Sequence, residues 1–211
     1  MPQDISGYDV GALLYCPANA HHTVAQAVAA ERLPRPFSLA LCLEDTVRAD
    51  ALAAAEQAVE QALRELTEAA QRRTFYRPLT FVRVRSPEQL ARLGRAYGKY
   101  RPLLTGFILP KFFIETCGAY CAVIRDLQAD GLDYFYMPVF EAPSMLPLHT
   151  RHAALAEVKA QLDALRECIL NIRVGGNDLC HVFGLRRDPG HTIYDLRPVA
   201  DVLTDLLTTF A

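Results

Sequence analysis

Several short apolar runs in this sequence end in an ionisable side chain. The residues that follow such runs are Glu44, Asp45, Arg83, Lys111, Glu141 and Asp178. Apolar runs of this length, separated by helix-like segments, are typical of buried parallel strands. In a barrel of alternating strands and helices, the carboxyl ends of the strands carry the chemistry. We therefore expect these side chains to gather around one site.

Two of these acids suggest a magnesium site. Glu141 and Asp178 follow consecutive predicted strands, and adjacent parallel strands lie ~4.8 Å apart, so both could share one ion. Two carboxylates, with water completing an octahedron, suit Mg²⁺. The four acids and two bases at the strand ends carry a net charge of −2. Gathering this charge in one cleft is unfavourable unless a cation neutralises it.

Arg83 suggests the binding of an anionic substrate, because a guanidinium group can hold a carboxylate through two parallel hydrogen bonds. An alternative interpretation stays open at this point. Side chains of this kind can also be solvated loop charges or salt-bridge partners, since every protein surface is rich in them.

Six strand-like segments alternate with helix-like segments along the chain. The predicted strands are residues 11–15, 37–43, 79–84, 106–109, 133–140 and 168–174. The predicted helices are residues 23–31, 50–73, a segment that starts at 86–88, and residues 117–128, 150–166 and 196–210. Residues 1–10 are expected to have little structure, and residues 185–194 to form a loop.

This strict alternation predicts an α/β fold with a parallel sheet covered by helices. A doubly wound open sheet usually has a glycine-rich turn after its first strand, and residues 16–20 contain no glycine. A TIM (β/α)8 barrel is therefore favoured, although a full barrel has eight units and about 250 residues. We expect residues 1–211 to form one partial barrel domain, truncated after about six units. Either the native protein is longer, or the chain assembles as a homo-oligomer that covers its open strand edges.

Composition excludes some classes of protein. The chain is 51% hydrophobic, which is enough for a core. Its net charge of −2 gives no support for a nucleic-acid surface. No apolar run approaches the ~20 residues that span a bilayer, and the first residues lack a signal pattern, so a cytoplasmic location is expected. The six cysteines are expected to be reduced, mostly buried thiols.

Five motifs resemble one enzyme family. In order along the chain, they are Leu-Glu-Asp-Thr-Val at 43–47, Val-Arg-Val at 82–84, Leu-Pro-Lys at 109–111, Phe-Glu-Ala at 140–142 and Gly-Asn-Asp-Leu at 176–179. Their order and spacing across roughly residues 11–184 are similar to those of the HpcH/HpaI aldolase and citrate lyase beta-subunit family.

The resemblance implies a TIM-barrel lyase or aldolase that breaks or forms a carbon–carbon bond beside a carboxylate, through an enolate stabilised by Mg²⁺ or, alternatively, Mn²⁺. The substrate would be a small oxo- or hydroxy-carboxylic acid or its acyl-coenzyme A thioester. By position, the resemblance assigns Glu141 and Asp178 as metal ligands, Arg83 as the substrate-carboxylate clamp, Glu44 and Asp45 as acid–base groups or holders of metal-bound water, and Lys111 as a supporting charge.

Two departures from the family pattern leave alternatives open. Arg85 stands where the family has asparagine. Residues 19–22 read Asn-Ala-His-His where family members that use coenzyme A usually have an arginine, so a thioester substrate is an open question. The alternative to an enzyme is a catalytically inactive barrel that serves as a subunit or scaffold.

Overall fold

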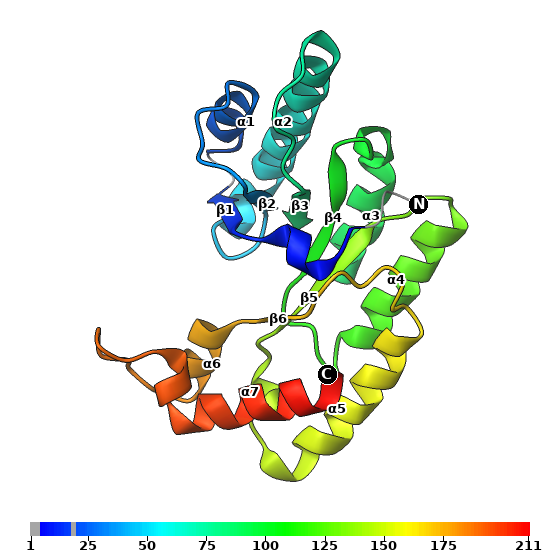
Figure 1. Ribbon diagram of the computed structural model, residues 1–211. Helices are drawn as coiled ribbons and strands as arrows, with labels where there is room; N and C mark the ends of the chain where they lie inside the picture. The colour runs from blue at the N-terminus through cyan, green and yellow to red at the C-terminus, as the bar shows by residue number, and fades with distance from the viewer. Residues whose placement is uncertain (1–4, 18–19) are drawn as a thin grey trace.

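Six parallel strands in chain order form the framework of the protein (Figure 1). The computed structural model describes residues 5–17 and 20–211; the side chains of His21 and His22, like residues 18–19, lie outside what it describes. The strands are β1 (Leu13–Pro17), β2 (Ser38–Cys42), β3 (Thr80–Arg83), β4 (Leu104–Leu109), β5 (Phe135–Phe140) and β6 (Arg173–Val174). Each pairs in parallel with the next strand along the chain.

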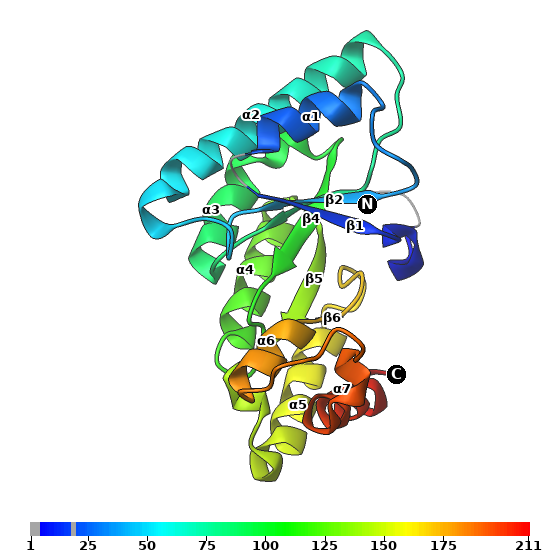
Figure 2. The same ribbon diagram turned by 90° about the vertical axis from the view of Figure 1, so that its left-hand side faces the viewer.

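The strands curve into a half-barrel whose convex side is covered by helices (Figures 1 and 2). The helices are α1 (His21–Ala29), α2 (Leu52–Arg72), α3 (Pro87–Ala96), α4 (Cys117–Ala129), α5 (Leu148–Asp163), α6 (Gly176–Val182) and α7 (Arg197–Phe210). The predicted fold class, a truncated TIM-type barrel of about six units, is confirmed.

Alternation along the strands divides the core into two clusters of buried side chains. Leu39 and Leu41 of β2 point outward and pack with the helices in the larger cluster. The smaller cluster lies on the inner face and consists of Val10, Ala40, Phe81, Ile108, Met137, Val139 and Leu170. Because both faces of the sheet are covered, the strands read as nearly continuous apolar runs.

The helices have the amphipathic faces expected of a covering layer. In α2, the buried face consists of Ala55, Val59, Ala62, Leu63 and Leu66. The start of α3 has the predicted cap, in which Ser86 Oγ accepts a hydrogen bond from the amide of Gln89, with proline at the first helical position. Helix α7 is fastened to α5 by the buried Arg151, whose Nη1 lies 2.8 Å from Asp205 Oδ2.

Two segments differ from expectation. Residues 168–174 were predicted as one strand, but only Arg173–Val174 forms regular pairing, preceded by an isolated bridge at Ile169. The N-terminal segment has more structure than expected, since residues 7–10 form a 3₁₀ turn whose Val10 packs in the inner cluster. Asn171 Nδ2 donates to the carbonyl of Gly7, so this segment reaches the region before β6.

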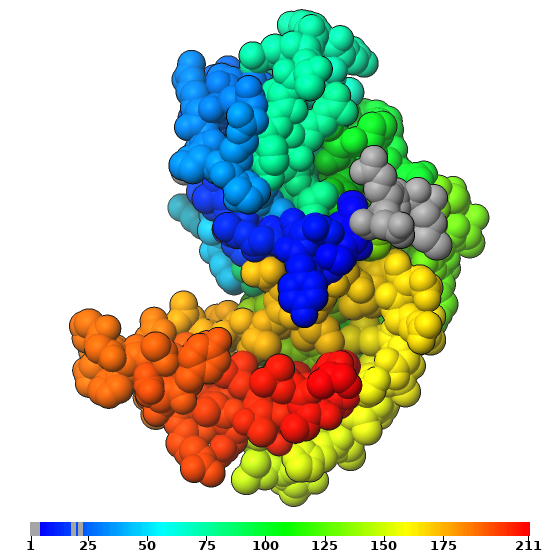
Figure 3. Space-filling model, in the orientation of Figure 1, coloured from blue at the N-terminus to red at the C-terminus, as the bar shows by residue number. Residues whose placement is uncertain are grey.

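The half-barrel is open between β1 and β6. The space-filling view shows a hollow between the first β/α units, in blue and cyan, and the last segment, in orange and red (Figure 3). None of the helices in the described part of the chain has the length and apolar character that a membrane span requires. The six cysteines are buried and form no disulfide in the described structure, as predicted.

Candidate active site

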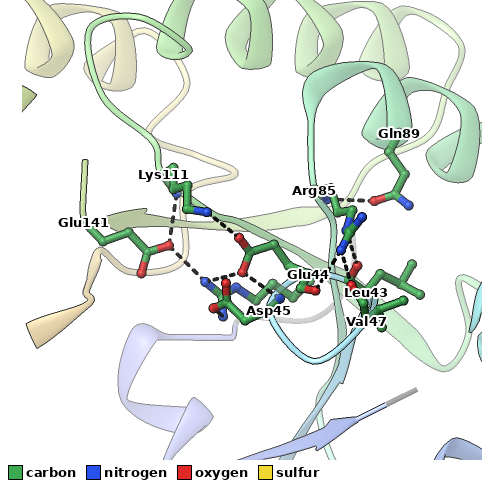
Figure 4. Close-up of polar contacts among 9 residues, drawn as sticks. Leu43, Glu44, Asp45, Val47, Arg85, Gln89, Lys111 and Glu141 are labelled. Atoms are coloured by element: carbon green, nitrogen blue, oxygen red, sulfur yellow. Dashed lines mark hydrogen bonds and ion pairs between the residues drawn. The ribbon is translucent and has the colours of Figure 1, made fainter. Parts of the chain in front are cut away.

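All six predicted site residues lie at the carboxyl ends of the strands. Glu44 and Asp45 follow β2, Arg83 is the last residue of β3, and Lys111 lies two residues beyond β4. Glu141 follows β5 directly, and Asp178 lies in the first turn of α6, just after β6. Parallel strands place these ends at the same edge of the sheet, and Figure 4 shows Glu44, Asp45, Lys111 and Glu141 turned toward one another.

Arg83 is the centre of this cluster. Its Nη2 lies 2.9 Å from Glu44 Oε2 and 2.9 Å from Glu141 Oε1, and its Nη1 lies 3.0 Å from Asp45 Oδ2. The Arg83 side chain is only 10% exposed. A guanidinium group with three carboxylate partners is fully charged at any physiological pH, and these partners raise its pKa further against the opposing effect of burial.

One of the three nitrogens of the Arg83 guanidinium group is left without a partner in the described structure. Its Nε is buried and has no hydrogen-bond partner among the described residues. A buried, unpaired donor is costly, so this nitrogen marks a place where a ligand oxygen would be stabilised. The planar end of the group is occupied by protein carboxylates, so Arg83 offers a ligand its Nε rather than a free two-nitrogen fork.

Lys111 neutralises the remaining oxygen of Glu44. Its Nζ lies 3.0 Å from Glu44 Oε1, and its backbone amide donates to Glu141 Oε1 over 3.1 Å. Lys111 has a φ of 49°, in the left-handed region that residues other than glycine rarely adopt. This backbone conformation aims both the amide and the ammonium group at the acids of the neighbouring strands.

Glu44 and Asp45 have different environments. Glu44 is 6% exposed, and burial raises its pKa although Arg83 and Lys111 oppose the rise. The Asp45 side chain is 51% exposed. Partial burial acts to raise the pKa of Asp45, but the hydrogen bond with Glu44 and the charges of Arg83 and Lys111 outweigh it and lower the pKa. Asp45 is therefore an ionised carboxylate at the rim of the site.

The carboxylates of Glu141 and Asp178 both lie beside Gly175, close enough for Asp178 to act on the pKa of Glu141. Glu141 is 4% exposed, whereas Asp178 is open to solvent. Burial raises the pKa of Glu141 to about 7, with Arg83 opposing and the contact with Asp178 adding to the rise. Two carboxylates in contact need either a shared proton or a cation between them.

Gly175 makes this approach possible. A Cβ atom on Gly175 would lie 2.2 Å from Glu141 Oε2 and 3.1 Å from Asp178 Oδ2, and contacts under 3.0 Å force atoms to move. The amide of Gly175 donates to the carbonyl of Phe140 over 3.1 Å, which fixes β6 beside the end of β5. Glu141 thus gives Oε1 to Arg83 and Lys111 and turns Oε2 toward Asp178.

The Glu141–Asp178 pair fits Mg²⁺ better than a metal that needs a protein cage. Among the described residues, no group of three or more histidine, cysteine, aspartate and glutamate side chains is placed to hold a metal ion. Mg²⁺ keeps several waters and binds through one or two carboxylates. The solvent-exposed position of Asp178 leaves room for such waters.

Arg85, the departure from the family pattern, turns away from the site. Its Nε donates to the carbonyl of Leu43, and its Nη2 donates to the carbonyls of Glu44 and Val47 (Figure 4). Its own amide donates to Gln89 Oε1. Arg85 therefore holds the loop between β2 and α2 that presents Glu44 and Asp45.

The sequence-based prediction missed two residues of the site, Gly175 and Tyr15. The ring of Tyr15 lies 5.9 Å from the guanidinium carbon of Arg83 and covers one of its faces. Tyr15 pairs with Ala40 of β2, whose side chain belongs to the inner cluster. The alternation of β1 could have indicated that Tyr15 faces inward.

A cavity of about 770 Å³ lies elsewhere, at the amino-terminal ends of the strands. Its lining includes Arg77, Leu79, Leu104 and Asp133. Because the chemistry of such folds is carried at the carboxyl ends of the strands, we place the candidate site at the acidic cluster and not in this cavity.

Comparisons with known proteins agree with this fold. A family model described as the C–C bond lyase of the TIM-barrel fold matches residues 4–211. The solved structure of protein CitE from Mycobacterium tuberculosis with magnesium and acetoacetate aligns with a TM-score of 0.57 and 20% identity, over 94% of this chain and 68% of that one. The same protein with magnesium and acetate aligns with a TM-score of 0.56 and 21% identity, over 94% and 69%. At such identity the likeness concerns the fold. No curated protein sequence matches the chain.

Proposed function

Because the chain belongs to the C–C bond lyases of the TIM-barrel fold, we propose that it is a Mg²⁺-dependent lyase or aldolase of the citrate lyase beta-subunit type. Its substrate is a small oxo- or hydroxy-carboxylic acid, free or as an acyl-coenzyme A thioester. The observation that carries the proposal is that the carboxylates of Glu141 and Asp178 both lie beside Gly175 at the strand ends. The CitE structures with magnesium and acetoacetate or acetate support the same combination of ion and ligand.

In this proposal, the carboxylates of Glu141 and Asp178 would hold the ion. When bound, Mg²⁺ supplies positive charge beside the oxygen on which negative charge develops as the carbon–carbon bond breaks. Mn²⁺ has similar ligand preferences and is an alternative. Arg83 and Lys111 keep Glu141 Oε1 occupied, so that the second oxygen of this carboxylate is oriented toward Asp178.

The other residues bind substrate and move protons. Arg83 Nε donates a hydrogen bond to the substrate carboxylate, which satisfies a buried donor. Asp45 Oδ accepts the proton of the substrate hydroxyl, because it is ionised and exposed. As that proton leaves, the hydroxyl group becomes a carbonyl group and the carbon–carbon bond breaks. The electron pair of that bond stays on the other fragment, on the carbon next to its carboxylate. Glu44 anchors Arg83 and Lys111.

Calorimetric titration with Mg²⁺ tests this proposal. We expect the wild-type protein to bind Mg²⁺, and Glu141→Gln and Asp178→Asn each to abolish binding, because each removes one anionic ligand while changing no volume. Glu157→Gln, on the exposed face of α5, is the matched control and should bind as wild type does. Equal Mg²⁺ affinity in all four proteins would overturn the metal assignment.

The same titration decides between an enzyme and an inactive barrel that acts as a subunit or scaffold. An inactive barrel has no need of a cation, so a wild-type protein that binds no Mg²⁺ would favour the subunit or scaffold alternative. Arg85 does not favour that alternative, because its contacts support the loop of Glu44 and Asp45.

A further inference from the structure

Two side chains on the edge strands point into the half-barrel. Arg173 of β6 pairs with Val139 of β5, and Val139 belongs to the inner cluster. Tyr15 of β1 pairs with Ala40, which belongs to the same cluster. Since residues paired across neighbouring strands share a face of the sheet, Arg173 and Tyr15 both project inward, from opposite edges of the open side.

Arg173 has no protein partner in the described part of the chain. It is half-buried, and no hydrogen bond or ion pair joins its guanidinium group to another described residue. The other cations of this end of the sheet are paired: Arg83 contacts three carboxylates, and Lys111 contacts Glu44. A half-buried cation on an inner face normally has an anionic partner.

Tyr15 contacts Arg83 and feels the charge of Arg173. Its ring covers one face of Arg83, and its side chain is accessible, with 39% of the residue exposed. Burial raises the pKa of Tyr15, while the positive charges of Arg173 and Arg83 act in the opposite direction. The tyrosine hydroxyl therefore lies within the electrostatic reach of both guanidinium groups, where it can donate to an anion.

Resting on the proposed function, we propose that Arg173 and Tyr15 form a second anion-binding subsite, and that the substrate is a dicarboxylic hydroxy- or oxo-acid. The first carboxylate of the acid binds at Arg83 Nε beside the Glu141–Asp178 pair. The second carboxylate binds at Arg173, with a hydrogen bond from the Tyr15 hydroxyl. A substrate whose one carboxylate binds at Arg83 Nε would leave Arg173 unpaired.

Calorimetric titration of two hydroxy acids in the presence of Mg²⁺ tests the subsite. Malate and lactate share the same hydroxy-acid end, and only malate has a second carboxylate. We expect wild type to bind malate at least about tenfold more tightly than lactate, since a charge-assisted hydrogen bond contributes enough for such a ratio. Arg173→Gln should bind both acids with the affinity that wild type has for lactate. Tyr15→Phe should reduce the malate preference and keep the ring over Arg83.

Arg166→Gln is the matched control, because it removes the same charge from an exposed position with 80% of its side chain accessible. It should keep the malate preference of wild type. An unchanged malate-to-lactate ratio in Arg173→Gln, or a ratio near one in wild type, would overturn the subsite.

Titration with Mg²⁺ alone separates this inference from the proposed function. Arg173→Gln should bind Mg²⁺ as wild type does. If wild type bound no Mg²⁺ but its preference for malate still depended on Arg173, the proposed function would fail and the subsite would stand.

Discussion

Arg83 connects acids that come from separate parts of the chain. Glu44 and Asp45 follow β2, and Glu141 follows β5, yet all three contact one guanidinium group. The planar guanidinium group has several diverging donors, which lets it meet three carboxylates at once. Breaking a buried ion pair by removing one partner leaves a buried charge and is strongly destabilising. Arg83 is therefore required both for the structure of the site and for the binding that we propose.

Arg83→Lys tests this double role. Lysine keeps the charge but cannot reach all three acids, so we expect a loss of about 3 kcal/mol in the free energy of unfolding, from two lost charge-assisted hydrogen bonds. We also expect acetate binding in the presence of Mg²⁺ to fall far more than the preserved charge would suggest. Denaturant unfolding and calorimetry measure the two effects. Arg166→Lys, an exposed exchange, is the control. Unchanged stability and unchanged acetate affinity would remove Arg83 from the site.

The positions of the charged residues could be predicted from the sequence, but their partners could not. A charge that follows an apolar run marks a strand end, and this rule located Glu44, Arg83 and Glu141 correctly. Whether Arg83 is free or already paired depends on its contacts with Asp45 and Glu141, which lie 38 and 58 positions away in the sequence. No local sequence pattern carries that information. The sequence predicted that Arg83 would hold a carboxylate through two nitrogens, whereas in the described structure only its Nε has no partner.

At the scale of elements, the junction between β6 and α6 positions Asp178 beside Glu141, the two metal ligands that we propose. Helix α6 begins at Gly176, directly after Gly175, so Asp178 lies on a helix whose first turn is fixed against the end of β5. The sequence indicated a strand end here but not the short helix, because consecutive glycines disfavour a helix and favour a turn. Tertiary contacts overcome this preference: the Gly175 amide bonds to β5, and Leu179 and Cys180 are buried.

Gly175→Ala tests the junction. The backbone angles of Gly175, φ −83° and ψ 73°, do not require glycine, so the effect should come from the new methyl group, which meets Glu141 Oε2. We expect the two carboxylates to separate and Mg²⁺ affinity to fall at least about tenfold, with a cost in unfolding free energy of about 1–3 kcal/mol from overpacking.

Gly118→Ala is the control for that substitution. Gly118 lies in α4, and its added Cβ would meet only Gln161 Oε1 at 3.8 Å. Alanine favours helices over glycine by about 1 kcal/mol, so this variant should be as stable as wild type or more so, with the same Mg²⁺ affinity. If Gly175→Ala behaved like Gly118→Ala, the glycine would have no positioning role.

At the scale of the whole molecule, the chain's own N-terminal segment covers part of the open side. Val10 packs on the inner face of the sheet, and the carbonyl of Gly7 accepts a hydrogen bond from Asn171. Figure 1 shows this segment, in dark blue, between β1 and β6. The sequence of residues 1–10 did not suggest such a role, because it contains no long apolar run and its hydrogen bond with Asn171 spans 164 positions of the chain.

Edge strand β1 remains accessible in the described structure. It pairs with β2 on one side, and two of its large apolar residues, Leu14 and Tyr15, are 41% and 39% exposed. An accessible edge with apolar side chains is a template for pairing with another chain. We therefore propose that the 211-residue chain forms a homo-oligomer through this edge.

Leu14→Lys should shift the chain toward the 23.5 kDa monomer in light scattering, because a buried lysine at a pairing edge is unfavourable. Leu148→Lys, at a position 72% exposed on α5, should leave the oligomer intact. A wild-type chain that is monomeric at every concentration tested would show that this edge pairs with no second copy.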